Sequence, residues 1–154
     1  MKATTQLFEK ALDAWDNGES KSAFSLFLKA AKLGDPGAQL NVGHFYETGE
    51  GVRKNVAKAL YWYKSAWRSG HQTSACSNIA QLYAAQRKRQ SAILWWRKAI
   101  ERGDGEASLE LAKFLLGARG SMNKEVSALL NRAVASRRTT RNGVKEARKL
   151  LRTR

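Results

Sequence analysis

The sequence predicts an all-α protein built from consecutive helical hairpins, and three features of the chain support this prediction. Similar segments end at Gly34, Gly70 and Gly103, which gives repeat intervals of 36 and 33 residues. Such intervals are typical of proteins in which each repeat is one helix–turn–helix unit. Apolar residues within the segments recur at helical spacing. The chain also has a single Pro among 154 residues and is 43% hydrophobic, as expected of a folded, helix-rich protein.

The three similar segments cover residues 23–34, 59–70 and 92–103. Each begins with Ala, has bulky residues three and four positions later, and has Ala seven and Gly eleven positions after the first. Positions i, i+3, i+4 and i+7 share one face of a helix, so each segment predicts an amphipathic helix. A weaker fourth copy contains Val126, Leu129, Leu130 and Ala133.

The residues between these helices predict where helices end and begin. We expect Gly34, Gly70 and Gly103 each to end a helix in the left-handed conformation that glycine adopts without strain. Asp35 and Pro36 directly follow the first of them. Asp is favoured as an N-cap and Pro at the first helical position, so a new helix is predicted to begin there.

A second kind of segment alternates with the first, at residues 38–46, 75–83 and 107–115, and residues 7–15 predict a further helix of this kind. Each of the three has a small residue near its centre, which allows the two helices of a hairpin to pack closely. These small residues are Gly43, Ala80 and Ala112.

The last residues of the chain differ from the repeats. Residues 137–143 predict a polar connection, and residues 144–151 predict a short basic helix that covers the last apolar face of the stack. We therefore divide the chain into a helical repeat domain, residues 1–136, and a basic connection and capping helix of the same domain, residues 137–154. The apolar stripe of the capping helix is formed by Val144, Ala147, Leu150 and Leu151.

One repeat, residues 34–70, carries a more specific pattern. Its members are Gly34, Asp35, Ala38, Val42, Gly43, Tyr46, Ala57, Lys58, Ala59, Trp62, Tyr63, Ala66 and Gly70, with a glycine-containing loop at 49–52. This pattern strongly resembles the SEL-one-like repeat (SLR), a subclass of the tetratricopeptide-like repeats. The resemblance implies a right-handed α-solenoid of about four such hairpins with a C-terminal capping helix. The loop at 84–91 departs from the pattern: it lacks a four-residue insertion and resembles an ordinary tetratricopeptide turn.

The composition limits the classes of function. The chain has 28 Lys and Arg against 13 Asp and Glu, a net charge of +15, which favours an acidic protein, a nucleic acid or an anionic membrane surface as partner. A single cysteine, Cys76, excludes an internal disulfide and a multi-cysteine metal site. We find no apolar stretch long enough for a signal peptide or a membrane span, and we expect a soluble, cytoplasmic protein without membrane insertion.

No catalytic motif is present, so we expect neither an enzyme nor a cofactor. The chain lacks a phosphate-binding loop, a His-Glu-x-x-His pair and a Gly-x-Ser-x-Gly elbow. The two histidines are His44 and His71, and His44 has Thr48 rather than a second ligand four residues on, which argues against a metal site. We expect Cys76 to be a small buried residue.

The resemblance implies that the first helix of each hairpin lines a concave surface that holds the ligand. If Val42, Gly43 and Tyr46 pack inward, Asn41 and His44 lie on the opposite face. In related tetratricopeptide domains such positions hold peptide-binding Asn and Lys residues. An ordinary solvated face is the alternative. The equivalent positions, which we call the concave ladder, are Lys10, Asp13, Asn41, His44, Asn78, Gln81, Glu110 and Lys113.

Basic residues form a second candidate surface. They lie on one loop and in the C-terminal segment, and they form either a solvated tail or a docking surface for an acidic partner. This basic patch consists of Arg87, Lys88, Arg89, Arg137, Arg138, Arg141, Lys145, Arg148 and Lys149.

Taken together, these features favour a protein–protein interaction module that binds an acidic protein through its concave groove and basic surface. Such a module acts as an adaptor or as an inhibitor, and the resemblance to SLR proteins implies an immunity-type protein that blocks a toxin as one form of inhibitor. The alternative is a nucleic-acid-binding protein that uses the basic C-terminal segment, although no recognition module is present.

Overall fold

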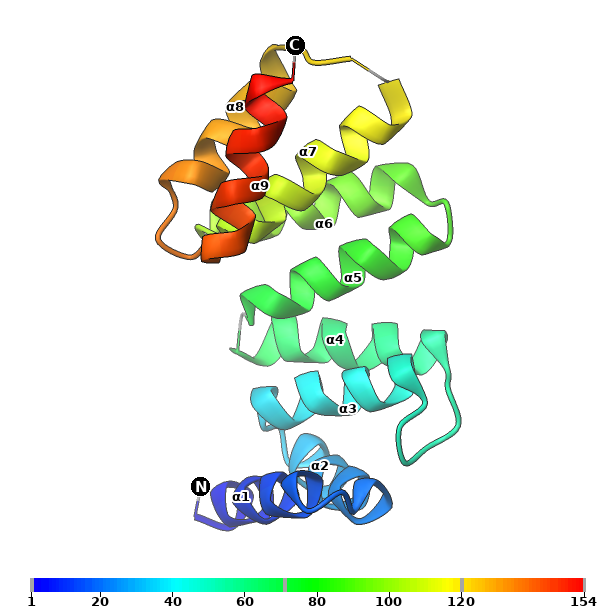
Figure 1. The fold of residues 1–154 in the computed structure, drawn as a ribbon. Coiled ribbons are helices and arrows are strands. Elements are labelled where there is room, and N and C mark those ends of the chain that lie inside the picture. The colour runs from blue at the N-terminus through cyan, green and yellow to red at the C-terminus, as the bar shows by residue number, and fades with distance from the viewer. Residues whose placement is uncertain (1, 71, 120, 154) are drawn as a thin grey trace. The chain divides into compact units, whose positions relative to one another are not determined.

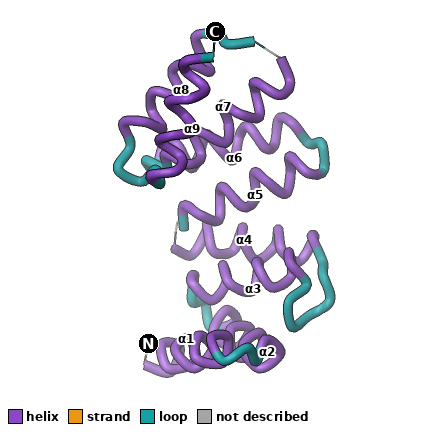
Figure 2. Tube along the Cα trace, in the orientation of Figure 1, coloured by secondary structure: helices purple, strands orange, loops and turns teal. Residues whose placement is uncertain are grey.

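The computed structural model describes residues 2–70, 72–119 and 121–153, and these residues contain nine α-helices and no strand (Figures 1 and 2). The all-α prediction is confirmed. The helices are α1 (Lys2–Asp16), α2 (Ser20–Lys32), α3 (Pro36–Thr48), α4 (Val56–Gly70), α5 (Thr73–Ala85), α6 (Arg89–Glu101), α7 (Gly105–Arg119), α8 (Lys124–Ala135) and α9 (Arg141–Arg152).

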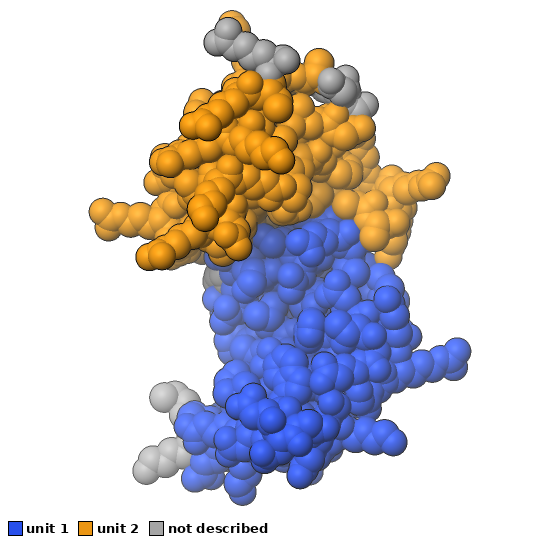
Figure 3. Space-filling model, viewed as in Figure 1, with its two compact units in different colours: residues 1–82 blue, residues 83–154 orange. Residues whose placement is uncertain are grey.

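The chain divides into two compact units, Met1–Leu82 (unit 1) and Tyr83–Arg154 (unit 2) (Figure 3). In unit 1, α1 packs with α2 and α3 packs with α4, and α2 also contacts α3. In unit 2, α7 packs with α8, α6 contacts α7, and α9 packs on α8 and α7. Successive helices therefore form hairpins within each unit, as the repeat pattern predicts.

Unit 1 is held together by close contact between helices. Gly43 of α3 lies where α4 approaches, and a Cβ atom at this position would lie 2.5 Å from two ring carbons of Tyr63. Val42, Phe45 and Tyr63 are themselves completely buried. The ring of Tyr63 thus fills the space that the missing side chain leaves, which confirms the predicted close packing at Gly43.

All three repeat glycines lie at helix ends as predicted, and two of them have the predicted conformation. Gly34 and Gly103 have left-handed φ angles of 92° and 83°. The predicted left-handed conformation is wrong for Gly70, which is the last residue of α4. Its small size serves packing instead, because a Cβ atom there would lie 2.5 Å from the Cβ of Pro36. Asp35 is the predicted N-cap of α3, and its carboxylate accepts a hydrogen bond from the backbone N–H of Ala38 at 2.6 Å.

The loop between α3 and α4 fastens the second hairpin to the first. Its Glu50 carboxylate accepts hydrogen bonds from the indole of Trp15 at 2.8 Å and from the hydroxyl of Ser20 at 2.7 Å. Gly49 and Gly51 both adopt left-handed conformations, with φ of 83° and 64°. A Cβ atom on Gly51 would collide with the backbone carbonyl of Ser20, so this glycine is required by both its conformation and its surroundings.

In unit 2, side chains from the C-terminal half complete the end of α6. The guanidinium of Arg132 donates to the carbonyl of Ile100 at 3.1 Å, and that of Arg138 donates to the carbonyl of Arg102 at 3.1 Å. The last carbonyls of a helix have no partner within the helix and carry partial negative charge. These two arginines therefore stabilise the helix end and join it to the later part of the chain.

A basic C-terminal helix is present, but its predicted start is wrong. We expected residues 137–143 to be a connection, whereas α9 begins at Arg141. The hydroxyl of Thr140 accepts from the N–H of Gly143 at 3.0 Å, and Glu106 accepts from the N–H of Thr140 at 2.7 Å. These two bonds start the helix early. The predicted apolar stripe faces α7 and α8, with Ala147 completely buried and the other members half-buried.

We predict that Gly43→Ala destabilises the protein. The new methyl group collides with the buried Tyr63 ring, and such overpacking costs about 1–3 kcal/mol, more than the helix propensity of Ala returns. Urea unfolding followed by circular dichroism measures the change. Gly117→Ala is the matched control, because Gly117 lies within α7 and a Cβ atom added there would meet no neighbouring group within 4 Å. The control should be neutral or stabilising, and equal effects of both substitutions would contradict the packing argument.

A second prediction concerns Glu50. Glu50→Ala leaves the Trp15 indole and the Ser20 hydroxyl without their acceptor, which should lower the free energy of unfolding by about 1–3 kcal/mol. Both donors bind the same oxygen, Oε1, so Glu50→Gln retains an acceptor for them and should cost less. The same unfolding measurement compares the two variants. A loss that is as large for Gln as for Ala would show that these hydrogen bonds do not fasten the loop.

Candidate functional site

The concave-ladder residues of unit 1 lie on α1, α3 and α5, opposite the buried faces of these helices. On α3, Val42, Gly43 and Tyr46 are buried as expected, while Asn41 and His44 are half-buried. The other positions on these helices are also accessible: Asn78 is half-buried, and Lys10, Asp13 and Gln81 are exposed. The exposed amide of Gln81 and the half-buried amide of Asn41 can donate and accept hydrogen bonds on this face.

His44 packs against an aromatic residue of the first hairpin. Its ring centroid lies 5.9 Å from that of Trp15, with the rings tilted by 46°. Within the described part of the chain, no group of three or more His, Cys, Asp or Glu residues is placed to hold a metal ion. The other histidine, His71, lies outside the described residues. Cys76 is completely buried, as expected of a small core residue.

A buried polar cluster at Tyr63 was not predicted from the sequence. The phenol of Tyr63 donates to the carboxylate Oε2 of Glu47 at 2.5 Å. Burial raises the pKa of Tyr63 well above its usual range, the Glu47 carboxylate raises it further, and a hydrogen bond with Asn78 opposes the shift. The phenol therefore remains a protonated donor. A buried Tyr needs a partner for its hydroxyl, which is the one signal in the sequence that points to such a cluster.

This cluster changes the role of one ladder residue. Asn78 of α5 lies beside the phenol of Tyr63 of α4 and lowers its pKa, so this amide faces the cluster. Glu47 is likewise held by the phenol. The amides that remain available on this face are those of Asn41 and Gln81.

In unit 2, the two ladder residues are bound to each other and to α9. The ammonium of Lys113 lies 3.1 Å from Glu110 and 3.2 Å from Glu146. The hydrogen bond that Lys113 donates to Glu110 raises the pKa of Lys113, burial lowers it, and Glu146 adds to the increase. Glu110 and Lys113 therefore connect α7 to the C-terminal helix rather than forming an open polar face.

The residues Arg87–Arg89 form a tight turn into α6. Arg87 has a left-handed φ of 58°, Lys88 is the N-cap and Arg89 is the first residue of the helix. The Arg89 guanidinium lies 5.2 Å from the ring centroid of Phe114, and the Lys88 ammonium lies 5.8 Å from that of Tyr83. Two of these three cations thus cover aromatic rings.

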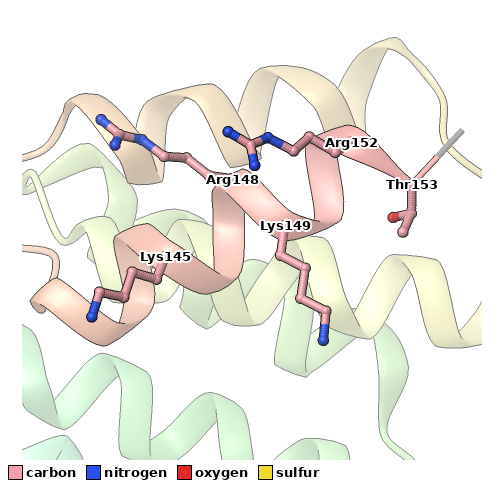
Figure 4. A pocket seen from close by; sticks show the side chains of 5 residues that line it. All are labelled: Lys145, Arg148, Lys149, Arg152 and Thr153. Atoms are coloured by element: carbon pink, nitrogen blue, oxygen red, sulfur yellow. The ribbon is translucent and has the colours of Figure 1, made fainter.

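The C-terminal part of the basic patch is more open. Arg138 is bound to the carbonyl of Arg102, whereas Arg137 and Arg141 are exposed. On α9, the exposed cations form a ridge beside a hollow of about 380 Å³ (Figure 4). In that view Lys145 and Lys149 extend to one side of the helix and the two arginines to the other. This α9 ridge consists of Lys145, Arg148, Lys149 and Arg152.

Charge is concentrated in unit 2. Residues 83–154 contain 18 Lys and Arg against 6 Asp and Glu, a net charge of +12, whereas residues 1–82 contain 10 against 7. Five of the six acidic groups of unit 2 have structural partners: Asp104 caps α7, Glu106 binds the start of α9, Glu125 pairs with Arg97, and Glu110 and Glu146 pair with Lys113. Among the described residues, none of the ion pairs involves the α9 ridge.

None of the helices that the structure describes combines the length and the apolar character needed to cross a membrane.

The chain matches known proteins over its repeats. The family model described as Sel1 repeat matches residues 19–35, 36–71 and 73–104, together more than half of the chain. Over 48 residues, the chain is 42% identical to the chitin synthase regulator SKT5 of Saccharomyces cerevisiae. The matched segment makes up 31% of this chain and 7% of that protein.

Two crystal structures share the fold. A Sel1 repeat protein from Oxalobacter formigenes superposes with a TM-score of 0.73 at 24% identity, over 96% of this chain and 62% of that one. A protective antigen of uropathogenic Escherichia coli with an SLR fold gives a TM-score of 0.71 at 23% identity, over 85% of this chain and 30% of that one. The chain spans less than two thirds of the length of each of these proteins. Sel1 repeats typically mediate protein–protein interactions. The repeat pattern, the hairpin fold and the family match agree, and the chain belongs to the Sel1 repeat family.

Proposed function

We propose that this chain is a protein-binding module whose partner is an acidic protein. The observation that carries the proposal is the net charge of +12 on unit 2, where five of the six acidic groups are engaged in helix caps, backbone contacts and ion pairs while the α9 ridge faces solvent. An unneutralised surface of one sign attracts a partner of the opposite sign and accelerates their encounter.

The polar face of unit 1 supplies a different kind of contact. The open amides of Asn41 and Gln81 can each donate and accept hydrogen bonds. Such groups fix the orientation of a bound chain, whereas exposed charges mainly govern the rate of association. We therefore assign orientation to unit 1 and attraction to unit 2.

Two forms of such a module fit these surfaces. An adaptor joins its partner to another protein, and an immunity-type inhibitor covers the active surface of a toxin. They differ in whether the partner loses its activity on binding. For both forms we propose a non-enzymatic role. We also propose that the protein acts in the cytoplasm, because this reducing compartment suits a chain whose single cysteine, Cys76, is free and buried.

Nucleic-acid binding through the C-terminal segment is the second candidate, favoured by the row of cations on α9. The environment of the aromatic rings in unit 2 argues against single-stranded nucleic acid as the ligand. Lys98 lies 4.4 Å from the ring centroid of Trp95, and cations also cover Tyr83 and Phe114. A base that stacked on one of these faces would have to displace the cation that lies over it.

We predict that loss of the α9 ridge slows association with the protein partner. The partner is captured from the native host on immobilised full-length chain at physiological salt, identified, purified and used in binding kinetics. Neutral substitution of the ridge should lower the association rate about tenfold at low salt, with a smaller change in dissociation. This variant, called the α9 variant, carries Lys145→Gln, Arg148→Gln, Lys149→Gln and Arg152→Gln.

A charge-preserving variant provides the control. The double variant Arg148→Lys and Arg152→Lys keeps the positive charge of the α9 ridge, so the association rate should not change.

The double variant Asn41→Ala and Gln81→Ala removes hydrogen-bonding groups from unit 1 and should instead accelerate dissociation. The protein-binding proposal is wrong if no saturable protein partner is captured. It is also wrong if nuclease treatment releases all of the captured material that depends on the α9 ridge for its binding to the immobilised chain.

A further inference from the structure

Unit 1 contains a cationic pocket that the sequence did not single out. It has a volume of about 310 Å³ and lies where the loop after α3 leads into α4. Three of its lining residues are cations, and the others supply an aromatic ring, an aliphatic side chain and an amide. The lining residues are Tyr46, Val52, Arg53, Lys54, Asn55 and Lys58.

The three cations of this pocket lack acidic partners. Arg53, Lys54 and Lys58 are exposed, and no ion pair among the described residues includes them. Two carboxylates lie nearby in the sequence, but both are bound elsewhere. Glu47 accepts from the Tyr63 phenol, and Glu50 accepts from Trp15 and Ser20. The fold thus directs the neighbouring negative charges away from the pocket.

The pocket concentrates part of the charge of unit 1. Residues 1–82 contain 10 Lys and Arg against 7 Asp and Glu, a net charge of +3. Three of these ten cations lie within six residues of one another and line the pocket. Like charges gathered at one place attract a partner of the opposite charge.

The walls of the pocket are fixed by contacts within the protein. The backbone N–H of Asn55 donates to the carbonyl of Tyr46 at 2.8 Å, and the Asn55 side chain accepts from the N–H of Lys58 at 2.9 Å. Asn55 therefore ties the loop to α3 and caps α4. The Lys58 ammonium lies 5.2 Å from the ring centroid of Tyr46. Asn55, Lys58 and Tyr46 are thus positioned before a ligand arrives, which lowers the cost of ordering this part of the pocket.

We propose that this pocket binds the acidic side chains of a protein segment, in particular neighbouring glutamates. Arg53, Lys54 and Lys58 neutralise the carboxylates, and Val52 contacts the methylene groups between carboxylate and backbone. A base-stacking ligand fits less well, because Lys58 covers the ring of Tyr46. The inference names the partner chemistry of the proposed function and rests on it for the identity of the partner as a protein.

The test uses the full-length chain and a labelled short peptide that carries consecutive glutamates, with a glutamine peptide of the same length as blank. The chain carries the α9 variant as background, so that the ridge does not compete for the peptide. Two further variants are compared in this background by fluorescence anisotropy at low salt. The pocket variant is Arg53→Gln, Lys54→Gln and Lys58→Gln. The control variant is Lys21→Gln, Lys29→Gln and Lys32→Gln, which removes the same charge from exposed positions of α2 in the same unit.

We expect the pocket variant to bind the glutamate peptide about tenfold more weakly than the background, and the control variant to change binding by less than about twofold, since isolated surface charges contribute little. Peptide addition should shift the backbone amide resonances of residues 49–58 in the background protein. Equal losses in the pocket and control variants would overturn the proposal. The proposal would also be overturned if a single-stranded oligonucleotide bound more tightly than the glutamate peptide and the pocket variant abolished that binding.

The two proposals fail in different ways. If the glutamate peptide does not bind while the captured partner still does, the pocket assignment is wrong and the protein-binding function stands. If the peptide binds at the pocket but no protein partner exists, the pocket assignment stands as an acid-binding site and the proposed function is wrong.

Discussion

The close approach of α4 to Gly43 of α3 determines much of what the surface of unit 1 offers to a partner. Because no side chain separates the two helices, the Tyr63 ring lies against the α3 backbone, and its phenol reaches Glu47. The same phenol is hydrogen-bonded to Asn78. One packing contact therefore removes a carboxylate and an amide from the polar face. It leaves Asn41 open and contributes to the unbalanced charge at the pocket in the following loop.

The acidic residues follow one rule in both units. The chain has only 13 of them against 28 cations, and the folded protein uses several as structural acceptors. Asp35 and Asp104 cap helices, Glu50 fastens a loop, and Glu106 binds the backbone at the start of α9. Carboxylates engaged in this way do not neutralise the cations beside them. The positive surface is thus a consequence of how the fold uses its few negative groups as well as of composition.

The features that the sequence predicts correctly are those with local causes. Helical periodicity gives the amphipathic helices, and the cap at Asp35 depends on a residue three positions away. The errors have distant causes. Gly70 follows the same local pattern as Gly34, yet its role depends on contact with Pro36. Periodicity also identifies which ladder positions are accessible, but the bonds that engage Lys113 with Glu146 depend on tertiary structure. Such partners, separated by more than thirty residues, leave no local signal.

The cations that follow the first helix of a hairpin are placed differently in the longer and the shorter loop. In the longer loop of unit 1, two left-handed glycines and the Glu50 contacts fix the path of the chain, and Arg53 and Lys54 line a pocket. In the short turn of unit 2, Lys88 and Arg89 lie over Tyr83 and Phe114. Contact with a ring does not by itself separate the two loops, because Lys58 beside the pocket also lies over a ring, that of Tyr46. The four-residue insertion of the SLR loop instead adds chain in which two further exposed cations, Arg53 and Lys54, lie beside Lys58.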